Sequence, residues 1–252
     1  MTIPATSMAW IRTTVPVLVL TSWMLWQRIP FFRGNYKRML LGSVFNASRM
    51  YLFFVAYILT TISNAVIVMY IWPVFVTVLS AYFLKEEITR RQIFLLMISM
   101  AGVVVVYSGH EFSIQNNDFV GLTAAVFSAL IFAMSVIVFK SEIQNYSRPE
   151  VIFYQNVVGP LVFLPFFMVN PFPTPLDWAL GTTHGVVIGL IMFGCFFYGL
   201  SKLKASTTAM VSYLEIISAV TLSVVFLDEE LTLNMIIGGL LIISSTALLR
   251  LE

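Results

Sequence analysis

The sequence predicts an all-α polytopic membrane protein, with about nine spans arranged as two inverted repeats of transmembrane helices. Composition, long apolar runs and an internal repeat support this prediction. Of 252 residues, 59% are hydrophobic and only 10% are charged, and the mean hydropathy is +0.92. A soluble domain of this length carries more charge on its surface. The start of the chain lacks a basic segment followed by a short apolar one, so we expect no cleavable signal.

The apolar runs have the length of membrane-spanning helices, since roughly 17–25 helical residues cross a hydrocarbon core of about 30 Å. Spanning strands would be shorter and would alternate apolar with polar residues. Turn-forming residues at 34–35, at 109 and at 171–175 separate several of the runs. The predicted spans are 13–27, 38–59, 63–84, 92–108, 119–139, 150–169, 180–200, 206–227 and 233–250.

The basic residues gather in alternate connecting loops. They are Arg28, Arg33, Lys37, Arg38, Lys85, Arg90, Arg91, Lys140, Arg148, Lys202, Lys204 and Arg250. The other loops carry acidic residues instead: Glu111, Asp118, Asp177 and the run 228–230. Because basic loops stay on the cytoplasmic side, we expect a protein of the inner or plasma membrane. Its N-terminus, with Arg12, would lie outside and its C-terminus in the cytoplasm.

One stretch of the chain, residues 63–93, recurs in altered form as residues 206–236. Glu86 matches Glu229, a shift of 143 positions (229 − 86). The same shift aligns Ser63 with Ser206, Tyr70 with Tyr213, Phe83-Leu84 with Phe226-Leu227, and Thr89 with Thr232. Matching polar turns indicate a duplication, because chance likeness between apolar helices explains only the apolar matches. We expect a first repeat at 1–109 and a second at 118–252.

The two copies are expected to cross the membrane in opposite senses, because the turn at Glu86 is basic and its counterpart at Glu229 is acidic. Inverted repeats are common in secondary transporters, where two related halves exchange conformations to open either side. The second repeat has five predicted spans and the first has four. Either the chain lacks an opening helix or Met1 is an internal start, and we expect the second.

The repeated motif also resembles a known family. Tyr70-Ile71-Trp72-Pro73 leads to Phe-Leu-Lys-Glu-Glu-Ile-Thr at 83–89, and Phe-Leu-Asp-Glu-Glu-Leu-Thr follows at 226–232. This pattern is similar to the EamA-type members of the drug/metabolite transporter superfamily, over essentially the whole chain. The resemblance implies ten helices in two inverted five-helix repeats around a cavity that opens alternately. It also implies transport of small metabolites. This chain departs from the pattern in lacking the first helix.

Two charged residues within predicted spans are candidate substrate ligands, since a charge there is costly unless it faces protein or water. Arg49 could hold a carboxylate or phosphate, with Asn46 one turn away on the same face. Glu215 could hold a cationic group, carry a proton or pair with Arg49, on a cavity that the resemblance implies both helices line. The alternatives are a snorkelling Arg49, a static pair of Arg49 with Glu215, and interhelical hydrogen bonding by Asn46.

Three aromatic residues complete the candidate site. Trp72 is equivalent to Glu215 under the shift of 143, and Tyr70 is equivalent to Tyr213. Together they could form an aromatic layer for flat or cationic solutes. The alternative is ordinary helix packing. Pro73 could break its helix and free a carbonyl group, or only kink the helix.

The sequence predicts a transporter and not an enzyme. It shows no His-rich metal pattern, and the single Cys195 excludes an internal disulfide, so we expect no cofactor and no metal. The expected partners are a small-molecule solute and the lipid bilayer, without nucleic acid, and a homodimer is left open. We expect export of an amino acid or related solute. A nucleotide-like or adenosyl solute is an alternative, as is a transport-inactive or truncated membrane subunit.

Overall fold

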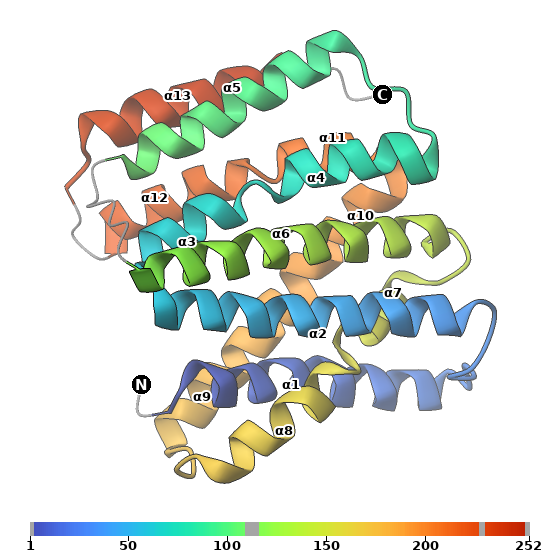
Figure 1. The fold of residues 1–252 in the computed structure, drawn as a ribbon. Helices are drawn as coiled ribbons and strands as arrows, with labels where there is room; N and C mark the ends of the chain where they lie inside the picture. The colour runs from blue at the N-terminus through green and yellow to red at the C-terminus, as the bar shows by residue number, and fades with distance from the viewer. Residues whose placement is uncertain (1–2, 109–115, 227–229, 250–252) are drawn as a thin grey trace. The chain divides into compact units, whose positions relative to one another are not determined.

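The computed structural model describes residues 3–108, 116–226 and 230–249, which fold into helices with no strand in those ranges (Figure 1). Eight helical stretches of this part are long and apolar enough to cross a membrane. They are Ala5–Trp26, Tyr36–Leu59, Asn64–Leu84, Arg90–Tyr107, Asp118–Glu142, Arg148–Val169, Pro175–Lys202 and Ala205–Phe226. Leu233–Ala247 is a shorter apolar helix. The predicted all-α polytopic fold is confirmed.

The chain folds into two compact units, and each unit draws on both halves of the sequence. Unit 1 comprises Met1–Phe54 with Met134–Lys202, and unit 2 comprises Val55–Ala133 with Leu203–Glu252. Shifting 1–54 by 143 gives 144–197, which lies within the second segment of unit 1. Each unit therefore joins segments that the duplication makes equivalent. The repeat boundaries at 1–109 and 118–252 stay a prediction.

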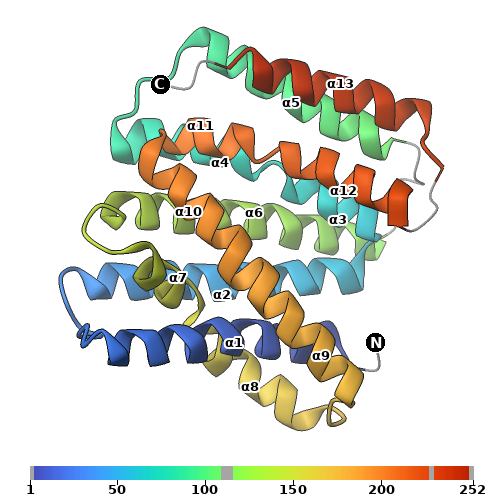
Figure 2. The same ribbon diagram turned by 180° about the vertical axis from the view of Figure 1, so that it is seen from behind.

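Unit 1 is built around helix α1, Ala5–Trp26, which packs against α7 (Arg148–Asn156), α8 (Gly159–Val169), α9 (Pro175–His184) and the π-helical segment η2 (Gly185–Met192). The unit also includes most of α2 (Tyr36–Leu59), the end of α6 (Asn116–Glu142) and α10 (Phe193–Lys202). Segments α9, η2 and α10 continue into one another as a rod that runs obliquely to α1 (Figure 2).

Glycines spaced four residues apart let this rod approach α1. A Cβ atom added to Gly181 would lie 2.8 Å from Ile11 Cγ2, and one added to Gly185 would lie 2.9 Å from Val15 Cβ. Gly189 faces Pro16 in the same way. Small residues on one helix face permit the close packing that membrane helices use for association. The sequence analysis did not identify this ridge.

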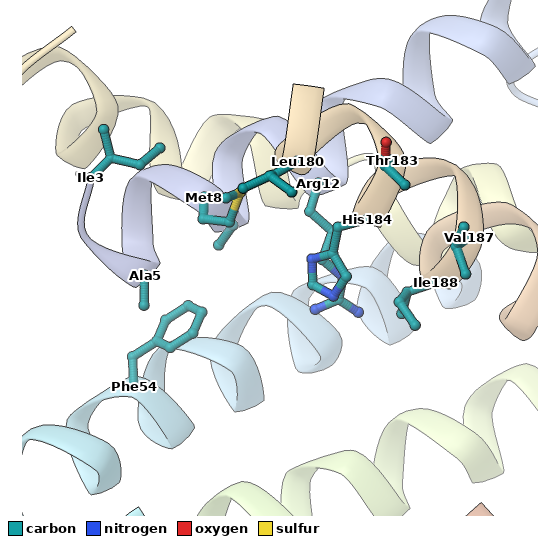
Figure 3. A pocket seen from close by; sticks show the side chains of 11 residues that line it. Ile3, Ala5, Met8, Arg12, Phe54, Leu180, Thr183, His184, Val187 and Ile188 are labelled. Carbon is teal, nitrogen blue, oxygen red and sulfur yellow. The ribbon is translucent and has the colours of Figure 1, made fainter. Parts of the chain in front are cut away.

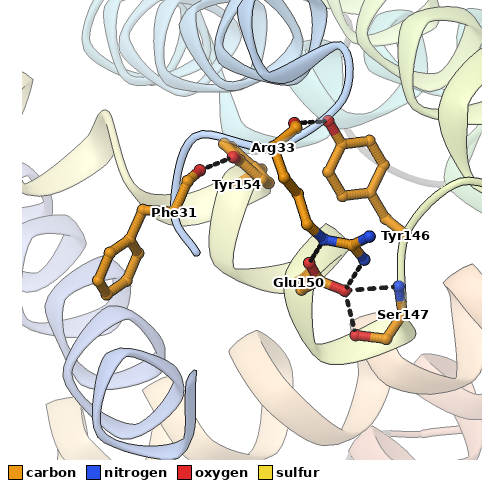
Figure 4. Close-up of polar contacts among 6 residues, drawn as sticks. All are labelled: Phe31, Arg33, Tyr146, Ser147, Glu150 and Tyr154. Carbon is orange, nitrogen blue, oxygen red and sulfur yellow. Dashed lines mark hydrogen bonds and ion pairs between the residues drawn. The ribbon is translucent and has the colours of Figure 1, made fainter. Parts of the chain in front are cut away.

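The connection between α1 and α2 is tied to the start of α7 (Figure 4). Arg33 donates from Nε and Nη2 to the Glu150 carboxylate at 2.6 Å, and this bonding raises the pKa of Arg33. Glu150 also accepts from the backbone N–H and the hydroxyl of Ser147, and the Tyr146 hydroxyl donates to the Arg33 carbonyl at 2.7 Å. A bidentate pair with further donors is geometrically specific, so it fixes the path of this predicted cytoplasmic loop.

Unit 2 contains two tightly packed helices, α5 (Arg90–Tyr107) and α13 (Leu233–Ala247). A Cβ atom added to Gly238 would lie 2.5 Å from the Gly102 carbonyl oxygen, so backbone meets backbone here. The hydroxyls of Ser99 and Ser245 share a hydrogen bond of 2.6 Å across the same interface. Glycine at the contact and a buried serine pair are typical of close packing between membrane helices.

Unit 2 also contains the end of α2, most of α6 and several shorter helices. The shorter helices are α3 (Ile62–Met69), α4 (Trp72–Leu79), the π-helical η1 (Ser80–Leu84), α11 (Ala205–Val211) and α12 (Leu214–Phe226). The Glu86 carboxylate caps α11, accepting from the N–H groups of Ala205 at 2.6 Å and Ser206 at 3.2 Å and from the Ser206 hydroxyl at 2.8 Å. A carboxylate at a helix N-terminus satisfies free donors and the helix dipole. Its sequence counterpart, Glu229, lies outside the described residues.

The first predicted span starts too late. Helix α1 begins at Ala5, not at residue 13, so Arg12 lies inside the helix and not on an outer tail. The sequence-based span began directly after Arg12. In the structure, the hydroxyls of Thr13 and Thr14 donate to carbonyls one turn back, at Ala9 and Trp10, so they satisfy themselves within the helix.

Candidate functional site

Two spans of unit 2 are interrupted at equivalent positions. Helix α3 ends at Met69 and α4 starts at Trp72, while α11 ends at Val211 and α12 starts at Leu214. Tyr70 and Tyr213, which are equivalent under the shift of 143, lie one in each break. Interrupted helices in corresponding positions of two repeats are a typical feature of transporter binding sites, since they free backbone polar groups within the membrane.

A hydrogen bond links the two helix interruptions. The hydroxyl of Tyr213 donates to the backbone carbonyl of Tyr70 at 2.9 Å, and the centroids of their rings are 6.3 Å apart. Pro73 lies in the first turn of α4, where its missing N–H costs nothing. Tyr213 is fully buried, so its hydroxyl replaces water as the partner of this carbonyl. The expectation that a carbonyl is freed near Pro73 agrees with this geometry.

Glu215 lies in the first turn of α12, midway along the span Ala205–Phe226. Its carboxylate accepts a hydrogen bond from the Tyr70 hydroxyl, and Tyr107 of α5 lies within reach of its charge. The N-terminal dipole of α12 favours a negative charge at this position. The side chain is nevertheless exposed in this fold. The Glu215 carboxylate is therefore oriented by the Tyr70 hydroxyl, and it remains accessible to a cationic group.

The structure brings Tyr70, Tyr213 and Glu215 together, and it gives Trp72 a packing role. Trp72 is 4% exposed, and its ring meets the ring of Phe132 edge-on with centroids 4.8 Å apart. The packing alternative therefore describes the observed contact of Trp72. The role of all four residues as substrate ligands stays a prediction.

Asn46 and Arg49 lie in a polar network of unit 1, at the interruption between α7 and α8. Asn46 donates from Nδ2 to the Gln155 carbonyl at 2.9 Å, and Val158 donates its N–H to the Ser43 hydroxyl at 3.1 Å. Arg49 Nε donates to Asn46 Oδ1 at 3.3 Å. Asn46 thus makes the interhelical hydrogen bond considered from the sequence. Arg49 and Glu215 belong to different units, so their pairing remains a prediction.

A cavity of about 750 Å³ lies in unit 1 (Figure 3). It is lined by Ile3, Ala5, Met8, Ala9, Arg12, Phe54, Leu180, Thr183, His184, Val187 and Ile188. This cavity was not predicted from the sequence, because Arg12 was expected to lie outside the first span and His184 had no assigned role. The spacing of Gly181, Gly185 and Gly189 was the available signal, since it predicts close contact of that helix with another.

A metal centre finds no support in the part of the chain that is described. No group of three or more His, Cys, Asp or Glu residues gathers in residues 3–108, 116–226 and 230–249. Cys195 is a free, exposed thiol.

The apolar helices define the class of the protein as a multi-pass helical membrane protein. Its paired helix interruptions and intramembrane charges are typical of transporters. The EamA-like transporter family model matches residues 1–108 and 119–251. The chain belongs to this family, as the resemblance implied.

Two relatives of this chain are named as transporters. The chain is 27% identical over 248 residues to the pseudopaline exporter CntI of Pseudomonas aeruginosa, covering 96% of this chain and 84% of the relative. It is 24% identical to an S-adenosylmethionine uptake transporter of Rickettsia conorii over 73% of this chain and 62% of that protein. A solved crystal structure aligns with a TM-score of 0.85 at 18% identity, covering 97% of this chain and 88% of the other. This last match concerns the fold alone.

Proposed function

We propose that the protein is a secondary transporter that exports a small metabolite, an amino acid or related solute, by alternating access of two inverted repeats. The observation that carries this proposal is the pair of helix interruptions at Tyr70 and Tyr213, with the accessible Glu215 carboxylate beside them. Interruptions in corresponding positions of two halves typically accompany solute binding and rocking movements.

The charges in the spans support a zwitterionic solute. Glu215 offers a carboxylate to an ammonium group, and Arg49 offers a guanidinium to a carboxylate, at one or more stages of the transport cycle. Asn46 orients Arg49 through its hydrogen bond. Tyr70 and Tyr213 shape the backbone around Glu215, and Trp72 supports α4. All six residues identified from the sequence remain proposed to act on the solute, Asn46 and Arg49 in unit 1 and Tyr70, Trp72, Tyr213 and Glu215 in unit 2.

The test is flux in proteoliposomes that are loaded with a mixture of radiolabelled amino acids. Glu215→Gln and Arg49→Gln are each expected to reduce flux about tenfold or more, because a hydrogen bond to a charged group contributes roughly 1.5–3 kcal/mol. The matched controls are Glu87→Gln and Arg90→Gln, since both residues are exposed near the ends of spans. Unchanged flux in both site variants, with normal folding, would reject this site.

A second candidate solute class is adenosyl or nucleotide-like. Tyr70 and Tyr107 both interact electrostatically with Glu215, and aromatic rings bind cationic and flat groups. Radiolabelled S-adenosylmethionine loaded in place of the amino acids distinguishes the classes: flux of this solute without flux of the amino acids is expected if this candidate is right. Protein that moves neither class would support the alternative of a transport-inactive subunit.

The proposed orientation places the N-terminus outside and the C-terminus in the cytoplasm. Glu87 and Glu230 are equivalent under the shift of 143, and both are exposed. In a Cys195→Ser background, Glu87→Cys is expected to react with an impermeant maleimide only from the cytoplasmic side. Glu230→Cys is expected to react only from the outside. Labelling of both from one side would contradict the inverted arrangement. Size measurement in nanodiscs would test the homodimer.

A further inference from the structure

The cavity of unit 1 combines apolar walls with a cation. It lies where α1, the residue Phe54 of α2 and the α9–η2 rod meet (Figure 3). Among the described residues that line it, none is Asp or Glu, and the polar side chains are those of Arg12, Thr183 and His184. Its volume falls in the range of roughly 300–1,000 Å³ that small-molecule sites occupy.

Arg12 is the unusual member of this lining. Its Nε atom is buried and donates to no acceptor in the described part of the chain. The ion pairs found there, of Arg33 with Glu150 and of Arg38 with Glu142, do not involve it. A guanidinium within a membrane span is costly unless a partner or water compensates it, so an arginine at such a position indicates a functional site.

His184 extends the donor set around Arg12. The imidazole of His184 and the guanidinium of Arg12 overlap in the view of Figure 3, and the charge of Arg12 acts on the ring. Two donors facing one space are suited to a shared anion, which compensates the charge of Arg12. An arginine fork matches a carboxylate in a bidentate way.

We infer that Arg12 and His184 form a binding site for the carboxylate of a small molecule with an apolar body. Arg12 takes the carboxylate, His184 donates a further hydrogen bond, and Met8, Phe54 and Ile188 are among the apolar residues that surround the body of the ligand. Arg49 is not part of this lining, so the inference stands independently of the proposed solute site.

The experiment measures binding of radiolabelled 3-phenylpropionate to the full chain in nanodiscs of phosphatidylcholine, by scintillation proximity. Saturable binding is expected, with the uncharged 3-phenylpropanamide at least tenfold weaker as a competitor. Arg12→Gln is expected to weaken binding at least tenfold, and His184→Gln about two- to fivefold, whereas Arg90→Gln binds like the unchanged protein. Equal competition by the amide, or unchanged binding to Arg12→Gln, overturns the inference.

A second pair of variants keeps Arg12 in place. Val187 lines the cavity and its neighbour Val186 does not, and both are partly exposed. Val187→Trp is expected to abolish binding by filling the cavity, while Val186→Trp retains it. Loss in both, or in neither, contradicts the site. Nanodiscs with phosphatidylglycerol address a lipid occupant: if this lipid displaces 3-phenylpropionate completely at low mole fraction, the cavity is a lipid site and the inference fails.

Discussion

The paired breaks of unit 2 and the cavity of unit 1 differ in whether their intramembrane polar groups have hydrogen-bond partners. In unit 2, the carbonyl exposed by the break at Tyr70 receives the Tyr213 hydroxyl, and Glu215 receives the Tyr70 hydroxyl. In unit 1, Arg12 presents a buried Nε atom without an acceptor in the described part of the chain. The polar groups at the breaks of unit 2 therefore have hydrogen-bond partners within the protein, whereas Arg12 Nε in the cavity of unit 1 has no such acceptor in the described part of the chain.

This difference separates structural polarity from binding polarity. A polar group that has its hydrogen bonds holds helices in place, and removing its partner lowers stability. A charge that lacks a partner lowers the stability of the empty protein, and a ligand recovers that loss. Substitutions in the two regions should therefore change stability with opposite signs. The free energy of unfolding of each variant tests this difference.

The largest change is expected for Tyr213→Phe. The ring remains and the hydroxyl is lost, so the Tyr70 carbonyl becomes a buried acceptor without its partner. We expect a loss of about 1–3 kcal/mol in the free energy of unfolding. The measurement is reversible unfolding in mixed micelles, with Tyr82→Phe as the control because Tyr82 is 68% exposed. Equal stability of Tyr213→Phe and the control would show that the breaks do not depend on this bond.

The fold was predictable because the bilayer restricts the secondary structure that a spanning segment can adopt. Long apolar runs can only be helices there, and the shift of 143 that matches Glu86 with Glu229 also matches the two breaks. The break at Tyr70 has a sequence signal in Pro73. The break at Tyr213 has none of its own, since Ile216 occupies the position equivalent to Pro73. The repeat was the available signal for the second break.

The cavity could not be predicted for a different reason. A charge close to the first apolar run lowers the local hydropathy, so Arg12 was interpreted as a tail residue. Packing against glycines of the α9–η2 rod makes that segment helical instead, and tertiary contact of this kind has no signature within the segment itself. His184 alone matched no motif. Its meaning depends on Arg12, which is far away in the sequence.

Arg12→Met is expected to act in the opposite direction from Tyr213→Phe. Methionine has a similar length and fills the space beside apolar neighbours such as Met8 and Ile188, while the uncompensated charge disappears. We expect a gain of roughly 1 kcal/mol in the free energy of unfolding, within the range of stabilising substitutions at functional sites. Arg90→Met, on an exposed surface, serves as the control. A destabilised Arg12→Met protein would mean that Arg12 has a structural partner.

The smallest change is expected for Tyr70→Phe. This variant tests whether Glu215 is a structural polar group or a solute-binding one. The variant removes the donor to the Glu215 carboxylate but leaves the Tyr70 carbonyl and its bond to Tyr213 intact. Because the Glu215 side chain is exposed and the N-terminal dipole of α12 also stabilises its charge, we expect a loss of only about 0.5 kcal/mol in the free energy of unfolding. Flux in proteoliposomes should fall by a larger factor than this stability change implies, since the carboxylate loses its orientation. A loss of stability as large as that of Tyr213→Phe, with unchanged flux, would place Glu215 among the structural groups and remove it from the proposed solute site.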